Sequence, residues 1–269
     1  MSQFVKRIII LFIFVSVSML LTTGCSPRQR TLTREEAVRK LLGVKSQIKW
    51  NNDVVNQVRI YDDNGLKVQE IWKNPRGHTV TSRDLIYDDK TFNLKQVLWY
   101  KADDIEKSKY QYFYDRKGNL IQEKRLTPFD DLMLEKKYNY ENKKLMKEIV
   151  SGSKGTLLTE KEYEYDNGNQ IGFIERNNRG DIINRHRYEY DSNGQKILEQ
   201  WFEKREEPIL TKHFKYLNGL LIEELQYDRD GVLEQKILSE YDDNGLIQRK
   251  RWIDANENLI LENVYTYGY

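Results

Sequence analysis

The sequence predicts an all-β protein, an antiparallel β-meander repeat array with one short helix near the N-terminus. Tyrosines followed by turn residues recur every 25–27 residues, and turn-forming clusters fall every 12–13 residues. The segments between turns alternate aromatic or apolar residues with charged ones, as half-buried strands do. Even strand spacing without helical inserts is typical of hairpins in series. We therefore expect about 17 strands over residues 50–269, in an elongated, twisted or coiled sheet.

An anchor tyrosine marks each repeat, and turn residues such as Asp-Ser-Asn-Gly follow it. The anchor tyrosines are Tyr61, Tyr87, Tyr114, Tyr140, Tyr165, Tyr190, Tyr216, Tyr241 and Tyr267. Asp and Asn open such turns by bonding to their own backbone, and Gly accepts the positive φ that the turns require. This regularity predicts a quasi-one-dimensional array in place of two separate domains.

A second aromatic position lies 11 or 12 residues after several anchor tyrosines. It is occupied by Trp72, Trp99, Trp201, Tyr227 and Trp252. Rings at this position can form the core of a thin sheet, which is the simpler interpretation. They can also line a groove for a glycan or a peptide, because Tyr and Trp give a large contact area with a polar end. The five residues are therefore our candidate binding residues.

The first 24 residues have the layout of an export signal. Lys6 and Arg7 form a positive start, an apolar run follows, and small residues precede Cys25. The apolar run is shorter than the roughly 20 residues that a membrane-spanning helix needs, so we predict a signal peptide at residues 1–24. Its removal takes away two positive charges and no acids, which makes the mature chain neutral where the precursor carries +2.

Cys25 is the only cysteine of the chain, and it directly follows the signal segment. This arrangement resembles the signal of bacterial lipoproteins, with a relaxed lipobox of the kind found in spirochaetes, because Leu21 stands one residue further from the cysteine than usual. The resemblance implies that Cys25 is acylated, for example with palmitate, and anchors the chain to a membrane without spanning it. The implied location is the bacterial cell envelope, at the outer membrane or the cell surface. An ordinary secretory signal beside a chance cysteine is the alternative.

A short helix is expected after a polar, lipidated tether at residues 25–32. Thr33 and Glu36 fit a capping box as N-cap and N3, and Gly43 is a suitable residue to end the helix. Val38 and Leu42 contribute to an apolar stripe between them. We predict a capping helix at residues 33–43 that covers the first edge of the sheet.

The repeat unit resembles the YD repeats of bacterial Rhs and wall-associated proteins, and more faintly MORN-type hairpin repeats. The likeness rests on Tyr-Asp-x-x-Gly-x-Leu/Ile segments, as in residues 114–120, and covers roughly residues 50–269. The period of 25–27 residues is longer than the ~20 residues usual in YD repeats. The resemblance implies a β-repeat protein of the surface or envelope.

No constellation of catalytic residues is visible in the sequence. His78, His186 and His213 lie in different repeats, and His186 and His213 are expected on opposite faces of the sheet. A lone cysteine excludes an intrachain disulfide and a cysteine-based zinc site. The Asp-rich turns are explained by turn chemistry and lack the spacing of a calcium loop. We expect no enzyme activity, no cofactor, no metal and no nucleic-acid partner.

The sequence therefore indicates a non-catalytic, envelope-anchored lipoprotein that presents a β-repeat surface. Its expected partners are the membrane, through Cys25, and an unidentified protein or carbohydrate. An immunity or antitoxin-like protein that binds a single toxin is the alternative function. A pull-down that yields one stoichiometric partner would favour this alternative.

Overall fold

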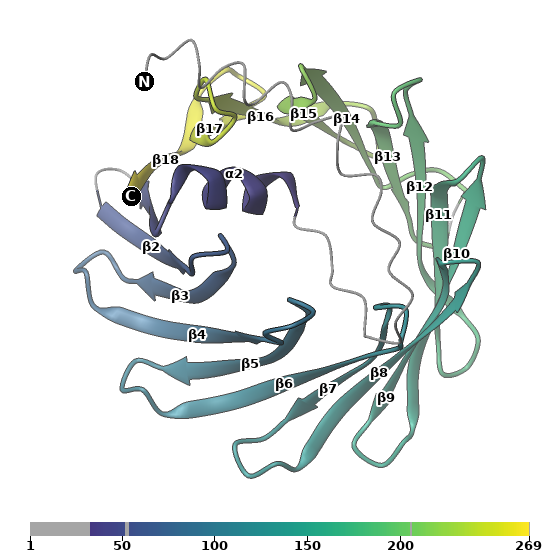
Figure 1. Ribbon diagram of the computed structural model, residues 1–269. Helices are drawn as coiled ribbons and strands as arrows, with labels where there is room; N and C mark the ends of the chain where they lie inside the picture. The colour runs from purple at the N-terminus through teal and green to yellow at the C-terminus, as the bar shows by residue number, and fades with distance from the viewer. Residues whose placement is uncertain (1–32, 52–53, 205, 269) are drawn as a thin grey trace, which may run out of the picture.

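Within residues 33–51, 54–204 and 206–268, which the computed structural model describes, the chain forms a closed antiparallel β-barrel of 18 strands with one helix (Figure 1). The elements are α2 (Arg34–Leu42), β1 (Ser46–Asn51), β2 (Val54–Tyr61), β3 (Lys67–Lys73), β4 (Thr79–Tyr87), β5 (Leu94–Lys101), β6 (Glu106–Tyr114), β7 (Leu120–Leu126), β8 (Leu132–Glu141), β9 (Lys144–Gly152), β10 (Leu157–Asp166), β11 (Asn169–Asn177), β12 (Ile182–Tyr190), β13 (Lys196–Phe202), β14 (Leu210–Leu217), β15 (Leu220–Asp228), β16 (Leu233–Tyr241), β17 (Ile247–Asp254) and β18 (Leu259–Gly268). Each strand pairs with its neighbours in sequence, so the topology is a continuous meander.

The barrel closes because its first strand pairs with its last. β1 pairs with β2 on one side and with β18 on the other, and Ser46 and Asn51 lie opposite Gly268 and Asn263. The expectation of an elongated open or coiled sheet is therefore wrong, although the all-β prediction is correct. The repeat pattern does not predict β1, because no anchor tyrosine or turn precedes it. Strand twist makes a wide sheet curl. Because β1 pairs with both β2 and β18, the curled sheet that the described residues form has no unpaired edge strand.

Helix α2 has the caps that the sequence predicts. The Thr33 hydroxyl accepts a hydrogen bond from the backbone N–H of Glu36, whose carboxylate accepts one from the Thr33 N–H at 2.8 Å. Gly43 ends the helix at φ 67°. The residues that the structure describes include no helix long and apolar enough to cross a membrane.

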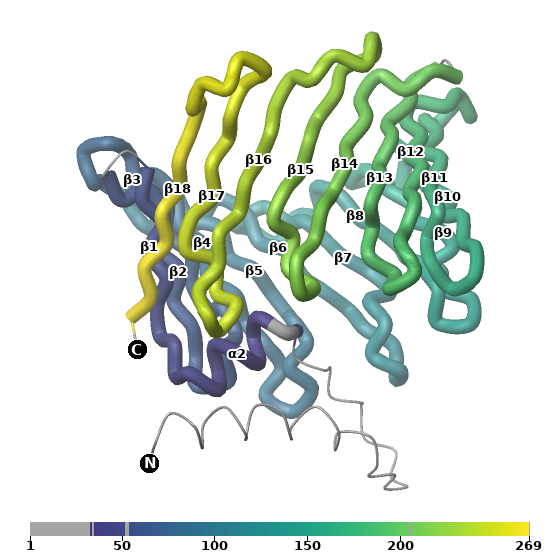
Figure 2. The backbone as a smooth tube through the Cα atoms, turned by 90° about the horizontal axis from the view of Figure 1, so that it is seen from above, coloured from purple at the N-terminus to yellow at the C-terminus, as the bar shows by residue number. Residues whose placement is uncertain are grey.

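The position of α2 differs from the expected one, because the closed sheet has no free edge at β1 to cover. The helix lies inside the mouth of the barrel, at the end that also carries the β16–β17 turn (Figures 1 and 2). Val38 and Leu42 pack there against the buried cluster of Val44, Tyr61 and Leu246. The helix therefore joins the first and last repeats at one rim of the barrel.

The two faces of each strand differ in exposure. Along β12, Tyr188 is half-buried, whereas its neighbours Arg187 and Glu189 are exposed. The tyrosine-bearing face points into the barrel, because α2 lies within the ring of strands and places the Arg39 guanidinium 4.5 Å from the centre of the Tyr61 ring. We call this face the inner wall and the opposite face the outer wall.

Water reaches the inner wall, because the barrel is too wide for its side chains to fill. On the inner wall, the side chains of Lys136 and Lys161 are 33% and 23% exposed to solvent. Barrels of 16–18 strands generally leave an aqueous interior. The buried apolar residues among those described are few: Val44, Tyr61, Leu66, Val97, Leu126, Phe173, Phe202, Ile237 and Leu246.

The anchor tyrosines tie consecutive repeats together at one rim. The strand register shifts at these tyrosines, for example between Glu164 and Tyr165, so the opposing strand carries an extra residue there. Seven anchor hydroxyls donate a hydrogen bond to the backbone carbonyl 20 residues earlier, at 2.7–3.1 Å. The donors are Tyr87, Tyr114, Tyr165, Tyr190, Tyr216, Tyr241 and Tyr267. The accepting carbonyls, such as that of Leu145, lie at the bulge of the preceding repeat. This ladder explains why Tyr, and not Phe, recurs at the anchor position.

Replacing Tyr165 with Phe tests the ladder. The change removes the 2.9 Å bond to the Leu145 carbonyl and leaves the ring in place. We expect a loss of about 1–2 kcal/mol in the free energy of unfolding, because a part-buried carbonyl loses its donor. Urea denaturation measures this loss. Phe113→Tyr on the outer wall, where the ring is 39% exposed, is the matched control and should change stability by less than about 0.5 kcal/mol.

Candidate binding site

Four of the five aromatic candidates lie on the inner wall. They are Trp72, Trp99, Trp201 and Trp252. Each of them lies opposite an inner-wall residue of the neighbouring strand. Tyr227 is different: its neighbour Gln226 pairs with Lys212 on the inner wall, so Tyr227 points outward. On the outer wall its ring makes an edge contact with His213, with centroids 5.5 Å apart. In the sequence, Tyr227 and the four tryptophans occupy the same position of the repeat. In the structure, Tyr227 lies on the opposite wall from the tryptophans.

Trp72 and Trp99 form a stacked pair on β3 and β5. Their ring centroids lie 5.4 Å apart with an interplanar angle of 13°. Arg83 on the strand between them places its guanidinium 5.3 Å and 4.9 Å from the two ring centres. Cation–π contact of this kind holds the side chains in place. The three residues give the inner wall a flat aromatic surface beside a fixed positive charge.

A second aromatic cluster crosses the inner wall from β10 to β13. Tyr163 lies 6.0 Å from Phe173, Phe173 stacks on His186 at 4.3 Å, and His186 lies 4.9 Å from Trp201. His186 is 9% exposed, and His213 is exposed on the outer wall, so the two histidines lie on opposite faces as predicted. The sequence does not single out Phe173, because its partners are 10 and 13 residues away and only the strand register brings them together.

Charged side chains form a belt around the inner wall beside these rings. Its acidic members lie eight to ten residues after an anchor tyrosine: Glu70, Glu123, Glu148, Glu175, Glu199 and Glu224. Most of them meet a basic residue of a neighbouring strand. Lys136 lies 3.4 Å from Glu148, and Lys212 lies 2.7 Å from Glu224. Glu123 instead accepts a hydrogen bond from the hydroxyl of Tyr138 at 3.2 Å.

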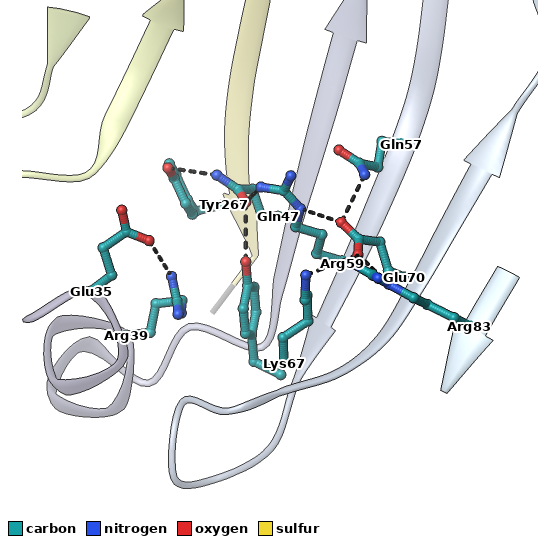
Figure 3. A network of polar contacts seen from close by, with 10 residues as sticks. Glu35, Arg39, Gln47, Gln57, Arg59, Lys67, Glu70, Arg83 and Tyr267 are labelled. Carbon is teal, nitrogen blue, oxygen red and sulfur yellow. Dashed lines mark hydrogen bonds and ion pairs between the residues drawn. The ribbon is translucent and has the colours of Figure 1, made fainter. Parts of the chain in front are cut away.

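Glu70 is the most enclosed member of this belt, with 2% exposure (Figure 3). Its carboxylate meets the Nζ of Lys67 at 2.9 Å, the Nε of Arg59 at 2.9 Å and the guanidinium of Arg83 at 2.5 Å. The amide nitrogen of Gln57 donates a further bond at 2.8 Å. Burial alone would raise the pKa of Glu70, but these hydrogen bonds and charges outweigh it and lower the pKa to about 2. The carboxylate therefore stays ionised.

Glu199 has a similar environment on β13. It contacts the Nδ1 of His186 at 3.2 Å, the indole N–H of Trp201 at 2.7 Å and the ammonium of Lys196. Burial opposes ionisation, but the hydrogen bonds from these three residues lower the pKa of Glu199 to about 2. An ionised carboxylate with occupied lone pairs is a structural anchor for the rings around it and a poor general base at neutral pH. The described residues also contain no group of three His, Cys, Asp or Glu placed to hold a metal ion.

No family model matches the sequence, and none of the curated proteins compared with it matches either. Among solved structures, the chain is similar to a porin-like protein from Bacteroides uniformis, with a TM-score of 0.46 and 9% identity over 84% of this chain and 98% of that chain. A porin-like protein from Bacteroides vulgatus gives 0.39 and 11% over the same shares. The Tc holotoxin pore of Photorhabdus luminescens gives 0.19 and 12%, over 76% of this chain but 17% of that one.

Proposed function

We propose that the chain is a non-catalytic binding protein of the bacterial cell envelope, which takes a protein or carbohydrate ligand on the inner wall of its barrel. One observation carries this proposal: aromatic faces and ionised side chains lie side by side on a wall that water reaches. The stacked pair of Trp72 and Trp99 beside Arg83 is the clearest example. Flat rings next to fixed charges are the groups that bind sugars and peptides from water.

The composition of the outer wall supports attachment through a lipid anchor and not through the barrel. Lys137, Glu162, Arg187 and Lys215 stand exposed on the outer wall in the middle or later part of their strands. A Lys or Arg on the lipid-facing side of a barrel costs roughly 2–4 kcal/mol at the centre of a bilayer. Charged side chains at these positions favour contact with water over burial in a bilayer. Cys25, which lies outside the described residues, is the proposed point of acylation.

Binding to purified protein tests the proposal. The mature chain, with Cys25 replaced by Ser to keep it free of lipid, is screened against glycans and peptides, and hits are measured by calorimetry. We expect Trp99→Ala to weaken a hit about tenfold or more, because truncated interface tryptophans typically cost 1–2 kcal/mol or more. Tyr227→Ala, on the outer wall, is the matched control and should leave the affinity unchanged. A ligand that responds to Tyr227 and ignores Trp99 would place binding on the outer wall and contradict the proposal.

A further inference from the structure

The charge belt of the inner wall is interrupted where the barrel closes. After six of the anchor tyrosines the belt position holds a glutamate, but nine residues after Tyr241 it holds Lys250. Four residues before an anchor tyrosine the belt carries a base in five repeats: Arg83, Lys136, Lys161, His186 and Lys212. The other four positions hold Gln57, Tyr110, Ile237 and Asn263, the last of them before Tyr267. Where the barrel closes, a base and an amide thus stand at the two positions that hold an acid and a base in repeats such as that of Glu148 and Lys136. We call this part of the inner wall, formed by β17, β18 and β1, the seam.

Two lysines meet at the seam without acidic partners. Lys250 lies opposite Asn263 on β18, and Asn263 lies opposite Asn51 on β1, two residues from Lys49 on the same wall. Among the residues that the structure describes, neither lysine forms an ion pair with a carboxylate. Burial, followed by the positive charges of Arg59 and Lys250, lowers the pKa of Lys49. The seam is therefore a site on the inner wall where two positive charges lie near each other without a carboxylate of the described chain between them.

Asn263 is an unusual residue at the centre of the seam. It is 1% exposed, and its amide lies beside the hydroxyl of Tyr265 without forming a hydrogen bond of normal geometry. The side-chain oxygen of Asn51, on the opposite strand, is also buried without a hydrogen-bond partner among the described residues. Buried polar groups without partners cost free energy and are rare in folded proteins. These amide atoms are covered from water, so a ligand at the seam would contact the lysines and not the amides.

An aromatic face completes the arrangement. Trp252 lies on the same strand and wall as Lys250, and the Lys250 ammonium sits 5.1 Å from the centre of its ring. Trp252 is half-buried, so part of its surface remains accessible to water. Sugars combine a flat apolar side with polar groups, which suits an indole beside an ammonium group. An acidic substituent on the sugar would sit between the two lysines.

We propose that the seam binds an acidic saccharide, with Lys49 and Lys250 holding its carboxylate, phosphate or sulfate group and Trp252 contacting its ring. This proposal rests on the proposed function, because it places the ligand on the inner wall and specifies its chemistry. It differs from the Trp72 and Trp99 site in location and in charge. The lysines would be retained despite their mutual repulsion, because the ligand and not the protein supplies the compensating charge.

The test compares matched saccharides on the mature chain with Cys25→Ser. Oligogalacturonate is titrated by calorimetry against neutral galactan oligomers of the same length and against poly-glutamate. We expect oligogalacturonate to bind at least about tenfold more tightly than galactan, with an affinity that falls as salt is added. Lys49→Gln and Lys250→Gln should each remove most of this preference. Lys137→Gln and Lys215→Gln, on the outer wall, are the controls and should keep it.

A second readout separates binding from structure. Because Lys49 and Lys250 repel each other in the free protein, Lys250→Gln should leave the melting temperature unchanged or raise it, whereas a purely structural lysine would lower it. Inorganic sulfate should raise the melting temperature of the parent protein more than that of the Lys49→Gln/Lys250→Gln double variant. Equal binding of galactan and oligogalacturonate would overturn the anion site and leave the proposed function standing. Tighter binding of poly-glutamate would overturn the saccharide class, and binding of none of the probes, with no sulfate effect, would overturn the seam site.

Discussion

Replacing Glu70 with Gln is expected to lower the free energy of unfolding by about 3 kcal/mol or more. The carboxylate is 2% exposed and is the shared counter-charge of Arg59, Lys67 and Arg83. Without it, three cations remain close together on the inner wall with no acid between them. The side chains of these cations are 25–31% exposed, so water solvates part of their charge after the substitution. The loss in the free energy of unfolding should therefore lie near the lower end of the range known for broken buried ion pairs. Urea denaturation at neutral pH measures the difference.

Acid should remove this difference. The pKa of Glu70 is lowered from 4.5 to about 2, so its contribution to stability is complete above pH 4.5 and is lost as the pH falls towards 2. The gap in stability between the parent protein and Glu70→Gln should therefore narrow over that interval. Glu162→Gln on the outer wall, whose side chain is 51% exposed beside Lys147, is the control and should change stability by less than about 0.5 kcal/mol. A Glu70 variant that behaves like this control would contradict the network of Figure 3.

Replacing Gly65 with Ala should displace helix α2 from the mouth of the barrel. Gly65 has φ 74°, and a Cβ there would lie 2.4 Å from the backbone oxygen of Glu36 and 2.8 Å from the backbone nitrogen of Lys40. The backbone atoms of a helix are fixed by its hydrogen bonds, so single atoms cannot shift to relieve the clash. The whole helix must move, and it then loses its contacts with Tyr61 and the β2–β3 turn. We expect a loss of about 2–4 kcal/mol, from the clash together with the cost of a positive φ. Faster hydrogen exchange confined at first to α2 would show that the helix has moved.

Gly77→Ala is the matched control for this change. Gly77 has φ 80° in the turn between β3 and β4, and a Cβ there would meet nothing within 4 Å. The two substitutions share the cost of a positive φ, about 1 kcal/mol, and only Gly65 adds the clash. Equal losses at the two positions, with α2 still protected, would show that the helix does not rest on this turn.

The local features of the fold could be predicted because each depends on neighbours in the sequence. Thr33, Glu36 and Gly43 specify the helix ends within three to ten residues, and the Asp-Asn-Gly turns place the hairpins. Closure could not be predicted in the same way. Closure depends on the pairing of residues 46–51 with residues 263–268. These two segments are far apart in the sequence, and no sequence pattern indicates that they pair. The alternation of Gln47 and Lys49 with Ile48 and Trp50 is typical of a strand, but it does not name a partner.

The candidate site was predictable in composition but not in geometry. The tryptophans at the second aromatic position are visible as a pattern, and four of them share a wall. Tyr227 shows the limit, because the turn after Tyr216 is one residue shorter than the turn after Tyr190. Tyr216 pairs with Leu221, whereas Tyr190 pairs with Lys196, so the same count along the chain ends on the outer wall. The cluster of Phe173 and His186 and the two lysines of the seam come together through strand pairing alone. Lys49 and Lys250 are 201 positions apart in the sequence, so no local pattern connects them.

The distance between the two end strands tests the closed barrel, on which the inner wall and the seam both depend. Spin labels are attached at Ile48 and Thr266, which are cross-strand partners of β1 and β18, in a chain with Cys25 replaced by Ser. Closure predicts one short distance, set by the ~4.8 Å between neighbouring strands and the length of the labels. An open sheet of this many strands would separate the labels by roughly 80 Å. A long or broad distance distribution would contradict the barrel, and with it both proposed sites.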